Sequence, residues 1–359
     1  MKSKWIIVAL AILLTLTSCI RDDSSSSRDQ NVLTFQNDSK SYSLLLPFKE
    51  SKTRLLHEAR SIHHEDTYEI TKQLLTLSSG YFEPKDYVIT EGQAISNEQY
   101  TNILKFNSAD IPYGINPQQD EQFTTEEGTV VKQPILIWDM FEVDFYKGAD
   151  KQNLAGMSLA LTINRTITLE DGSEQKLKES DILDYTENAA RKLMAYLRSL
   201  PEFKNIPIFI GIYSLEKQDS AVPGGYVSWA YFSGNSGDFS RQNEKWLILP
   251  SSQAKETIPS ISAQFDIISN NVRNFLPSEQ VGVIGFAQVS NNDVKVMKMV
   301  IHTTGKTYLE TKGIGQFTYD LIQQRAKEFN FDILIEVKVQ QKVRMVIEKK
   351  GNVVNYIEW

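Results

Sequence analysis

The chain has 359 residues, of which 41% are hydrophobic, a formal net charge of −7 and a single cysteine. A chain of this length can bury a sizeable core and suggests more than one domain or a repeated unit, while one cysteine excludes a disulfide bond within the chain. The acidic balance disfavours nucleic acid as a partner and gives no electrostatic attraction to an anionic lipid surface.

The first nineteen residues have the layout of a secretory signal. Two lysines form a positively charged n-region, residues 6–17 carry no charge, and Thr17 and Ser18 are the small residues expected before a cleavage site. A bilayer-spanning helix needs roughly 20 predominantly apolar residues, and this core is little more than half as long. We therefore expect residues 1–18 to be removed as a signal peptide and not kept as a membrane span.

The position of the cysteine narrows this prediction. The residues Leu16, Thr17, Ser18 and Cys19 resemble the lipobox of bacterial lipoproteins, in which a branched apolar residue and two small residues precede a cysteine. In such proteins a diacylglyceryl transferase attaches a thioether-linked lipid to the thiol, and signal peptidase II cuts just before it. The alternative interpretation is that Cys19 is buried in a core as a small hydrophobic residue. This interpretation is less favoured, because a signal core and a polar segment flank Cys19 and provide no core to bury it.

A lipidated Cys19 predicts a protein attached to the outer face of the cell membrane. Two or more acyl chains give stable anchoring, at about 0.8 kcal/mol per buried CH₂, without a spanning helix. We assign residues 19–31 to the lipidated cysteine and a flexible tether, which contains four consecutive serines among charged residues. Cleavage leaves 36 basic and 45 acidic residues, so the mature chain carries a net charge of −9.

The next segment, 32–133, is predicted to be a helix and loop region. Asp66 is a candidate N-cap with Glu69 three residues on, and the helix is expected to end at Gly80. Its apolar residues fall on one face: Ile70, Leu74 and Leu77. The prolines and glycines of residues 81–133 predict mostly loops and short strands.

A weak internal repeat occupies the rest of the chain. The first copy contains MSLALTINRT, a helical pattern through AARKLMAYLRSL, and IPIFIGIY. The second contains, in the same order, KVMKMVIHTT, YDLIQQRAKEF and DILIEVKV. Each copy follows another strand-like run, ILIWDMFEVDFY or VGVIGFAQV. A strand–strand–helix–strand unit therefore appears twice, which predicts an α+β fold with antiparallel or mixed sheets covered by helices.

We place the first copy at 134–250 and a linking helix with the second copy at 251–359. The linking helix is predicted from apolar residues that advance by threes and fours: Ile258, Ile261, Phe265, Ile268, Val272 and Phe275. Such a stripe favours packing against a sheet over contact with a partner or a membrane. Alternating apolar residues near the C-terminus predict a strand with one buried face: Ile333, Ile335, Val337 and Val339. The segment KKGN predicts a hairpin turn after it.

Few residues suggest catalysis or metal binding. His57, His63 and His64 cluster in the sequence, but no cysteine or clear fourth ligand completes a site, so we interpret them as solvated. Glu142 and Asp144 share one face of a strand, where paired carboxylates can serve acid–base catalysis, but we interpret them as solvent-facing. The chain has no Gly-x-Ser-x-Gly, P-loop or zinc-protease motif. We therefore predict neither an enzyme nor a bound metal or cofactor.

The glycine- and asparagine-flanked segment 219–240 is the first candidate for a ligand-contacting lip. Its PGG predicts a turn, and its aromatic residues are expected in a strand: Tyr226, Trp229, Tyr231 and Phe232. Three functions for the exported part stay open. The first is a lipid-anchored binding module for a small ligand, peptide or envelope component, which a cleft between the two copies would support. The second is a surface hydrolase, and the third is a carrier that only needs export and anchoring.

Several stretches together resemble one family: the signal segment, LLPFKESKTR, GYFEPKDYVITEGQAI, GMSLALTIN, IPIFIGIYSLEKQDSAVPGGYVSWAYF and the two-copy C-terminal half. The resemblance is to the CamS family of sex-pheromone lipoproteins from Gram-positive bacteria. It implies an anchored ectodomain without an established enzymatic role, and a signal peptide trimmed to a short hydrophobic pheromone that a peptide receptor reads. That peptide would begin at Ala11 or at Ile12, and in the second case it is Ile12, Leu13, Leu14, Thr15, Leu16, Thr17 and Ser18.

Overall fold

The computed structural model describes residues 41–60, 64–147, 150–217, 220–242, 244–276 and 281–359. The predicted signal peptide, lipobox and tether lie outside these residues, and so does His63. Ser39–Trp359 form one compact unit. Among the helices of the described part, none has the length and apolar character needed to cross a membrane.

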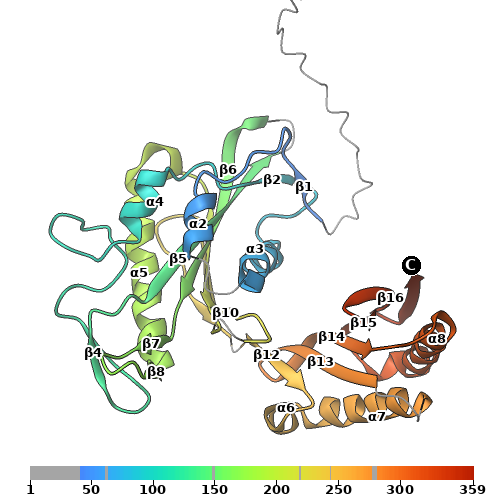
Figure 1. Cartoon of the computed structure of the whole chain (residues 1–359). Helices are drawn as coiled ribbons and strands as arrows, with labels where there is room; N and C mark the ends of the chain where they lie inside the picture. The colour runs from blue at the N-terminus through green and yellow to red at the C-terminus, as the bar shows by residue number, and fades with distance from the viewer. Residues whose placement is uncertain (1–40, 61–63, 148–149, 218–219, 243, 277–280) are drawn as a thin grey trace, which may run out of the picture. The chain divides into compact units, whose positions relative to one another are not determined.

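A seven-stranded mixed sheet contains the first repeat copy (Figure 1). In order across the sheet, its strands are β1 (Ser43–Leu44), β2 (Tyr87–Glu91), β5 (Ile137–Lys147), β6 (Asp150–Ile163), β9 (Ile208–Ser214), β10 (Gly225–Phe232) and β11 (Ser240–Arg241). β5 and β6 are antiparallel, and helix α5 (Glu179–Ser199) connects β6 to the parallel strand β9. The predicted strand–strand–helix–strand order is confirmed. The connection between β6 and α5 contains a small hairpin of β7 (Thr166–Thr168) and β8 (Glu174–Lys176).

A six-stranded sheet contains the second copy and repeats this connection. Its strands, in order, are β12 (Glu244–Leu249), β13 (Val281–Ser290), β14 (Asp293–Thr303), β15 (Asp332–Val339), β16 (Lys342–Lys350) and β17 (Val353–Glu358). β13 and β14 are antiparallel, and helix α8 (Tyr308–Arg325) connects β14 to the parallel strand β15. The predicted hairpin turn joins β16 to β17, where Gly351 adopts a positive φ of 56° that favours glycine.

The two sheets differ in how their faces are covered. In β5, β6 and β9 nearly every residue is buried, because α5 packs on one face and helix α3 (His64–Ser78) on the other (Figure 1). Strands buried on both faces are apolar at almost every position, as in IFIGIY. In β13, β14 and β15 buried residues alternate with more exposed ones, because α8 and α7 (Pro259–Phe275) pack on the face of the buried residues. The linking helix, which follows the short α6 (Ser252–Thr257), therefore covers a sheet as predicted.

The start of α3 differs from the prediction. The helix begins at His64, two residues before the expected cap, so Asp66 lies inside its first turn. Asp66 is buried, and its Oδ1 accepts hydrogen bonds from the Tyr213 hydroxyl and the Gly224 N–H, both at 2.7 Å. The side chain therefore ties α3 to the first sheet, and Asp66 does not occupy the predicted N-cap position.

The loop-rich segment before β5 contains elements of its own. These are α2 (Arg54–Arg60), α4 (Asn97–Ile103), β3 (Gln122–Thr124) and β4 (Val130–Lys132). We did not predict α4, although Ser96 and Gln99 form a capping box in which each side chain accepts the other residue's backbone N–H. The segment also supplies β2, which pairs with β5 and so extends the sheet of the first copy.

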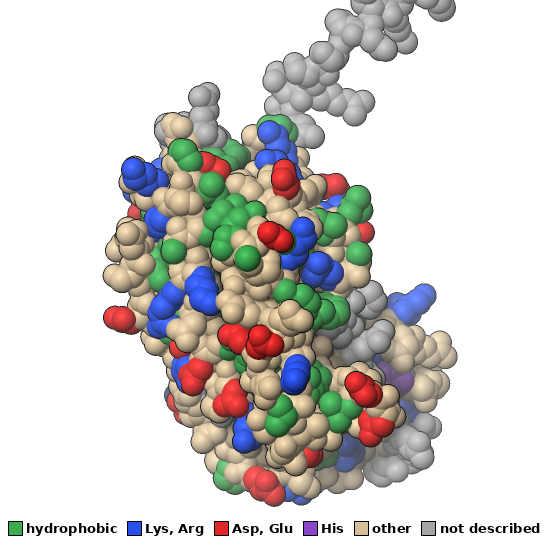
Figure 2. All heavy atoms as spheres, turned by 90° about the vertical axis from the view of Figure 1, so that its left-hand side faces the viewer, with side chains coloured by type: hydrophobic (Ala, Val, Ile, Leu, Met, Phe, Trp, Pro, Cys, Tyr) green, Lys and Arg blue, Asp and Glu red, His purple; other side chains and the backbone are tan. Residues whose placement is uncertain are grey.

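Charged side chains of both signs are interspersed on the face that Figure 2 shows. Among the ion pairs of the described residues, the Arg165 guanidinium lies 3.0 Å from the Glu126 carboxylate and 2.8 Å from that of Glu179. Two carboxylates thus surround one guanidinium, and the local excess of negative charge agrees with the acidic composition of the chain.

Candidate functional site

The aromatic segment singled out in the sequence forms strand β10, as predicted, but two of its residues belong to the core. Tyr226 is fully buried and Phe232 is 1% exposed, so neither can form a ligand-contacting lip. Trp229 and Tyr231 are half-buried and pack against the core cluster beside α3. The Tyr226 hydroxyl donates to the Ile70 carbonyl at 2.8 Å, which joins β10 to α3.

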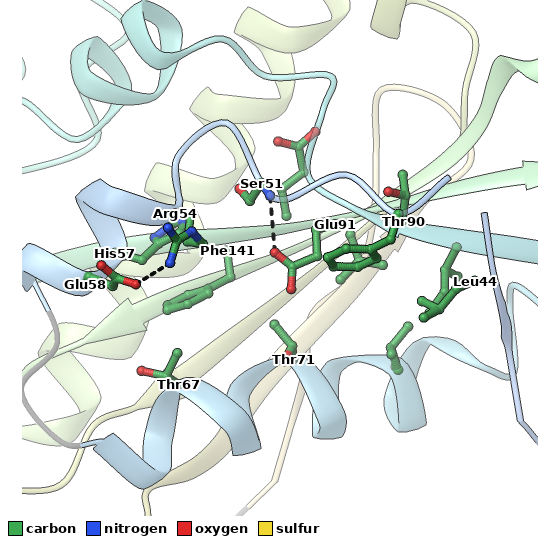
Figure 3. Close-up of a pocket in the computed structure, with 15 residues that line it drawn as sticks. Leu44, Ser51, Arg54, His57, Glu58, Thr67, Thr71, Thr90, Glu91 and Phe141 are labelled. Atoms are coloured by element: carbon green, nitrogen blue, oxygen red, sulfur yellow. Dashed lines mark hydrogen bonds and ion pairs between the residues drawn. The ribbon is translucent and has the colours of Figure 1, made fainter. Parts of the chain in front are cut away.

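The described residues enclose a cavity of about 740 Å³ elsewhere on the first sheet (Figure 3). One wall is a segment that we call the strap, residues 43–52, which is hydrogen-bonded beside β2 at both ends. The Leu45 N–H donates to the Ile89 carbonyl at 2.7 Å, and the Lys52 N–H donates to the Gly92 carbonyl at 3.3 Å. The other walls are α2, α3 and the faces of β2 and β5.

The lining changes from apolar to polar along the cavity. Figure 3 shows Leu44 of the strap at one end and the α2 residues Arg54, His57 and Glu58 at the other. Helix α3 contributes a stripe spaced by four residues: Thr67, Thr71 and Leu75. The sheet contributes an apolar floor that includes Ile89, Phe141 and Val143. An elongated ligand with one apolar end therefore fits the shape and polarity of the site.

A buried polar network holds α2 against β5 beside this cavity. The Nδ1 of His57 lies 2.9 and 3.0 Å from the two carboxylate oxygens of Asp139, which also accepts a hydrogen bond from the Tyr100 hydroxyl. Because a carboxylate only accepts, Nδ1 carries a hydrogen. Nε2 lies 2.7 Å from the Thr53 Oγ1, and the ring stacks on Phe141 with the centroids 4.4 Å apart. The interpretation of His57 as solvated is therefore wrong, since the residue is 8% exposed.

Thr53, His57 and Asp139 have the relative order of a nucleophile, a base and an orienting carboxylate. Thr53 is 3% exposed and does not line the cavity, and its Oγ1 also lies 2.9 Å from the Ser51 Oγ. Ser51, in contrast to Thr53, is one of the residues that line the cavity. This geometry fixes the start of α2.

The other histidines add no metal ligands to this network. The side chain of His64 lies outside the described residues, as does the whole of His63. Over the ranges that the structure describes, no three His, Cys, Asp or Glu side chains are grouped as a metal ion would require.

Glu142 and Asp144 are buried, so their interpretation as solvent-facing is wrong. Glu142 is 8% exposed and Asp144 is fully buried, because the turn before α4 covers this face of β5. Glu142 Oε1 accepts the backbone N–H groups of Ala94 and Ile95 at 2.9 and 3.1 Å. Asp144 Oδ2 accepts the N–H of Gln93 at 2.8 Å. The two carboxyls therefore hold a backbone turn to the sheet.

Burial also changes the acidity of this pair. It raises the pKa of Asp144 to about 6 and, together with the nearby Asp144 charge, raises the pKa of Glu142 well above its usual value. Taking a carboxyl group out of water disfavours its charged form. The folded protein consequently binds protons at this pair more readily than the unfolded chain does.

The substitution Glu142→Gln is expected to weaken the pH dependence of stability. Because both carboxyl pKa values are raised on folding, the stabilisation from protonating the pair is full below about pH 4. It is lost as the pH rises through about 6 and beyond. Glutamine keeps an acceptor oxygen for the turn but cannot ionise. Urea unfolding at pH 4.5 and pH 8 should therefore show a smaller loss of stability in the variant than in the wild type.

The exposed Glu127 provides the matched control, because Glu127→Gln removes a carboxylate from a solvated turn. That variant should lose as much stability between the two pH values as the wild type. An equal loss in Glu142→Gln would show that the buried pair does not titrate as its surroundings indicate.

Comparison with known proteins identifies sequence and structural relatives. Residues 48–353 match the family described as the CamS sex pheromone cAM373 precursor. The fold is shared with the crystal structure of a sex pheromone precursor from Lactobacillus salivarius, with a TM-score of 0.75 and 21% identity over 90% of this chain and 97% of that one. The C-terminal domain of a sex pheromone precursor from Staphylococcus aureus gives a TM-score of 0.68 and 20% identity, over 84% and 98% of the two chains. No curated protein matches the sequence.

Proposed function

Since the chain belongs to the CamS family of sex pheromone precursors, we propose that it is a surface lipoprotein whose signal peptide supplies a short hydrophobic pheromone. One observation carries this proposal: the only cysteine of the chain, Cys19, directly follows Leu16, Thr17 and Ser18 at the end of a short uncharged core. Those residue types at that spacing serve both the lipid-transfer and the cleavage step, and the core is too short to span a bilayer.

Two reactions would process the amino end. A diacylglyceryl transferase joins the diacylglyceryl carbon of a phospholipid to the Cys19 sulfur as a thioether. The bond between that carbon and the phosphate oxygen breaks, and the phosphorylated headgroup leaves with the thiol proton. Signal peptidase II then hydrolyses the Ser18–Cys19 peptide bond, which frees the amino group of Cys19 for further acylation. Small side chains at Thr17 and Ser18 let the peptidase bring its catalytic groups against the backbone. The acyl chains would hold the acidic body at the membrane without help from its charge.

Hydrolysis of a second peptide bond, before Ala11 or before Ile12, would trim the excised signal peptide to a fragment suited to a diffusible signal. The segment from Ala11 or Ile12 to Ser18 carries no charged side chain, and it combines branched apolar residues with three hydroxyl groups. Apolar surface with a few hydrogen-bonding groups is what a receptor pocket on a recipient cell distinguishes.

Mass spectrometry of the culture supernatant tests this function. We expect a peptide corresponding to Ile12–Ser18 or Ala11–Ser18 in cells that express the chain, and none in cells that lack it. The variant Ser18→Trp should reduce the yield, because a bulky side chain beside the scissile bond hinders the peptidase. Absence of both peptides from cells that lipidate and cleave the chain at Cys19 would contradict the proposal.

The proposal assigns no enzymatic reaction to the body of the protein, in keeping with a family whose members are not known as enzymes. The buried hydroxyl of Thr53 supports this view, since it is 3% exposed and engaged by both His57 and Ser51. The cavity favours a second candidate function, the binding of a small ligand or peptide near the membrane. Its volume of about 740 Å³ lies within the range of small-molecule sites.

A further inference from the structure

The cavity beside α3 combines an apolar floor with an excess of negative charge. At its polar end Arg54 lies between two carboxylates, with Nε 3.3 Å from Glu50 and Nη1 2.6 Å from Glu58. The positive charge of this arginine is therefore already offset before any ligand arrives. An anionic group on a ligand would gain little there and would face repulsion from the two glutamates.

Three glutamates line the cavity, of which Glu58 pairs with Arg54 and Glu142 accepts backbone N–H groups. The third, Glu91, is the carboxylate that we consider for a ligand. It extends from the end of β2, and Figure 3 shows it between Ser51 of the strap and Thr71 of α3. Its Oε2 accepts one long hydrogen bond, 3.4 Å from the Ser51 backbone nitrogen. No ion pair to Glu91 is formed within the described part of the chain, which leaves its charge available to a cationic group.

We infer that the cavity binds an apolar peptide by its free amino end, with the ammonium group on Glu91 and the first side chains toward Leu44. A primary ammonium donates up to three hydrogen bonds, and a bond between it and a carboxylate is charge-assisted. Ser51 and Thr71 flank Glu91 (Figure 3), and the Thr71 hydroxyl, which donates to the Tyr68 carbonyl at 3.4 Å, keeps its lone pairs for the first peptide N–H groups. The apolar residues beyond them, Phe48, Leu75 and Ile89, accept branched side chains.

The fragment Ala11–Ser18 of this same chain has the chemistry that the site requires. Once trimmed, it would have a free amino end, an apolar first half and no charged side chain, with its hydroxyls in the second half at Thr15, Thr17 and Ser18. This choice of occupant rests on the proposed function, which releases the fragment close to the anchored body. The cavity, its apolar floor and the unpaired charge of Glu91 do not depend on that release.

Calorimetric titration with a synthetic peptide tests the inference on the mature polypeptide, residues 19–359 with Cys19→Ser to keep it soluble. The probe is the octapeptide AILLTLTS, used with a free and with an acetylated amino end. We expect acetylation to weaken binding about tenfold or more, because it removes a charge-assisted hydrogen bond. Glu91→Gln should weaken binding of the free peptide by a similar factor and should abolish the difference between the two peptides.

Two further variants locate the site. Thr71→Trp, which fills the middle of the cavity, should remove binding of both peptides, while the matched control Glu127→Gln should bind as the wild type does. Circular dichroism and the urea midpoint establish that each variant is folded. Equal affinity for the two peptides, binding that survives Thr71→Trp, or no binding by the folded wild type would each overturn the inference. None of these outcomes bears on whether the peptide is released, which the supernatant measurement decides separately.

Discussion

Replacing Cys19 by alanine is expected to abolish membrane attachment and to leave residues 1–18 on the chain. Without the sulfur no thioether can form, and a peptidase that recognises the lipidated residue has no substrate. Each buried CH₂ of an acyl chain contributes about 0.8 kcal/mol, so two chains together outweigh any attachment by the acidic body. Membrane fractionation, the intact mass of the chain and labelling with a radioactive fatty acid measure the three consequences.

Ser24→Ala is the matched control for this substitution. It changes a small residue five positions away, outside the lipobox, and should leave attachment, cleavage and labelling unchanged. The released peptide should disappear from the supernatant of Cys19→Ala cells alone. A surface-exposed protein that keeps its first methionine and carries no fatty acid, in either strain, would rule out the anchoring proposal.

Asp139→Ala is expected to lower the free energy of unfolding by about 3–5 kcal/mol. Asp139 is 3% exposed and accepts hydrogen bonds from three groups: His57 Nδ1, the Tyr100 hydroxyl and the Met140 N–H. The substitution leaves all three donors buried without an acceptor, and each carries a desolvation cost. Urea unfolding followed by tryptophan fluorescence measures the loss.

Asp139→Asn separates the hydrogen bonds from the charge. Its amide oxygen still accepts one or two of the three donors, so the loss of stability should be smaller than for alanine. Asp120→Ala, at an exposed position, should change stability by less than about 0.5 kcal/mol. If Asp139→Ala were as stable as the Asp120 variant, the network around His57 would have no role in holding α2 to the sheet.

Sequence periodicity predicted the repeated part of the fold because those signals are local. The threes-and-fours spacing between Ile258 and Phe275 defines α7, and the alternation beginning at Ile333 defines β15. The start of α3 was misplaced because Asp66 has its partners at Tyr213 and Gly224. No local pattern shows that a carboxylate will be used more than 140 residues away.

The buried carboxylates show a second limit of the sequence. In a strand, alternation assigns Glu142 and Asp144 to the face opposite Phe141 and Val143, but it does not say whether water or protein covers that face. Here the turn 93–95 covers it and supplies backbone donors. The aromatic residues of β10 misled for the same reason, since both faces of that sheet are covered.

The cavity was not predicted at all. Its lining comes from residues between Leu44 and Val143, in separate short elements that carry no shared periodicity. The one sequence pattern within the lining is the helical spacing of Thr67, Thr71 and Leu75. Its mixed polarity does not indicate a ligand site. Only the packing of α2, α3 and the strap on the sheet brings these side chains together.

The strap is both a wall of the cavity and the first part of the fold that follows the amino end of the chain, so a force applied at that end reaches the cavity wall first. In a protein held at Cys19, a pulling force enters the described fold at Ser41 and acts first on β1, which is paired with β2 only through Ser43 and Leu44. After the Leu45 N–H bond to the Ile89 carbonyl, the next backbone bond along the strap is that of Lys52, beyond Phe48. Tension would thus peel Leu44 and Phe48 from the wall before it reached the sheet core, so membrane traction and occupancy of the cavity would oppose each other.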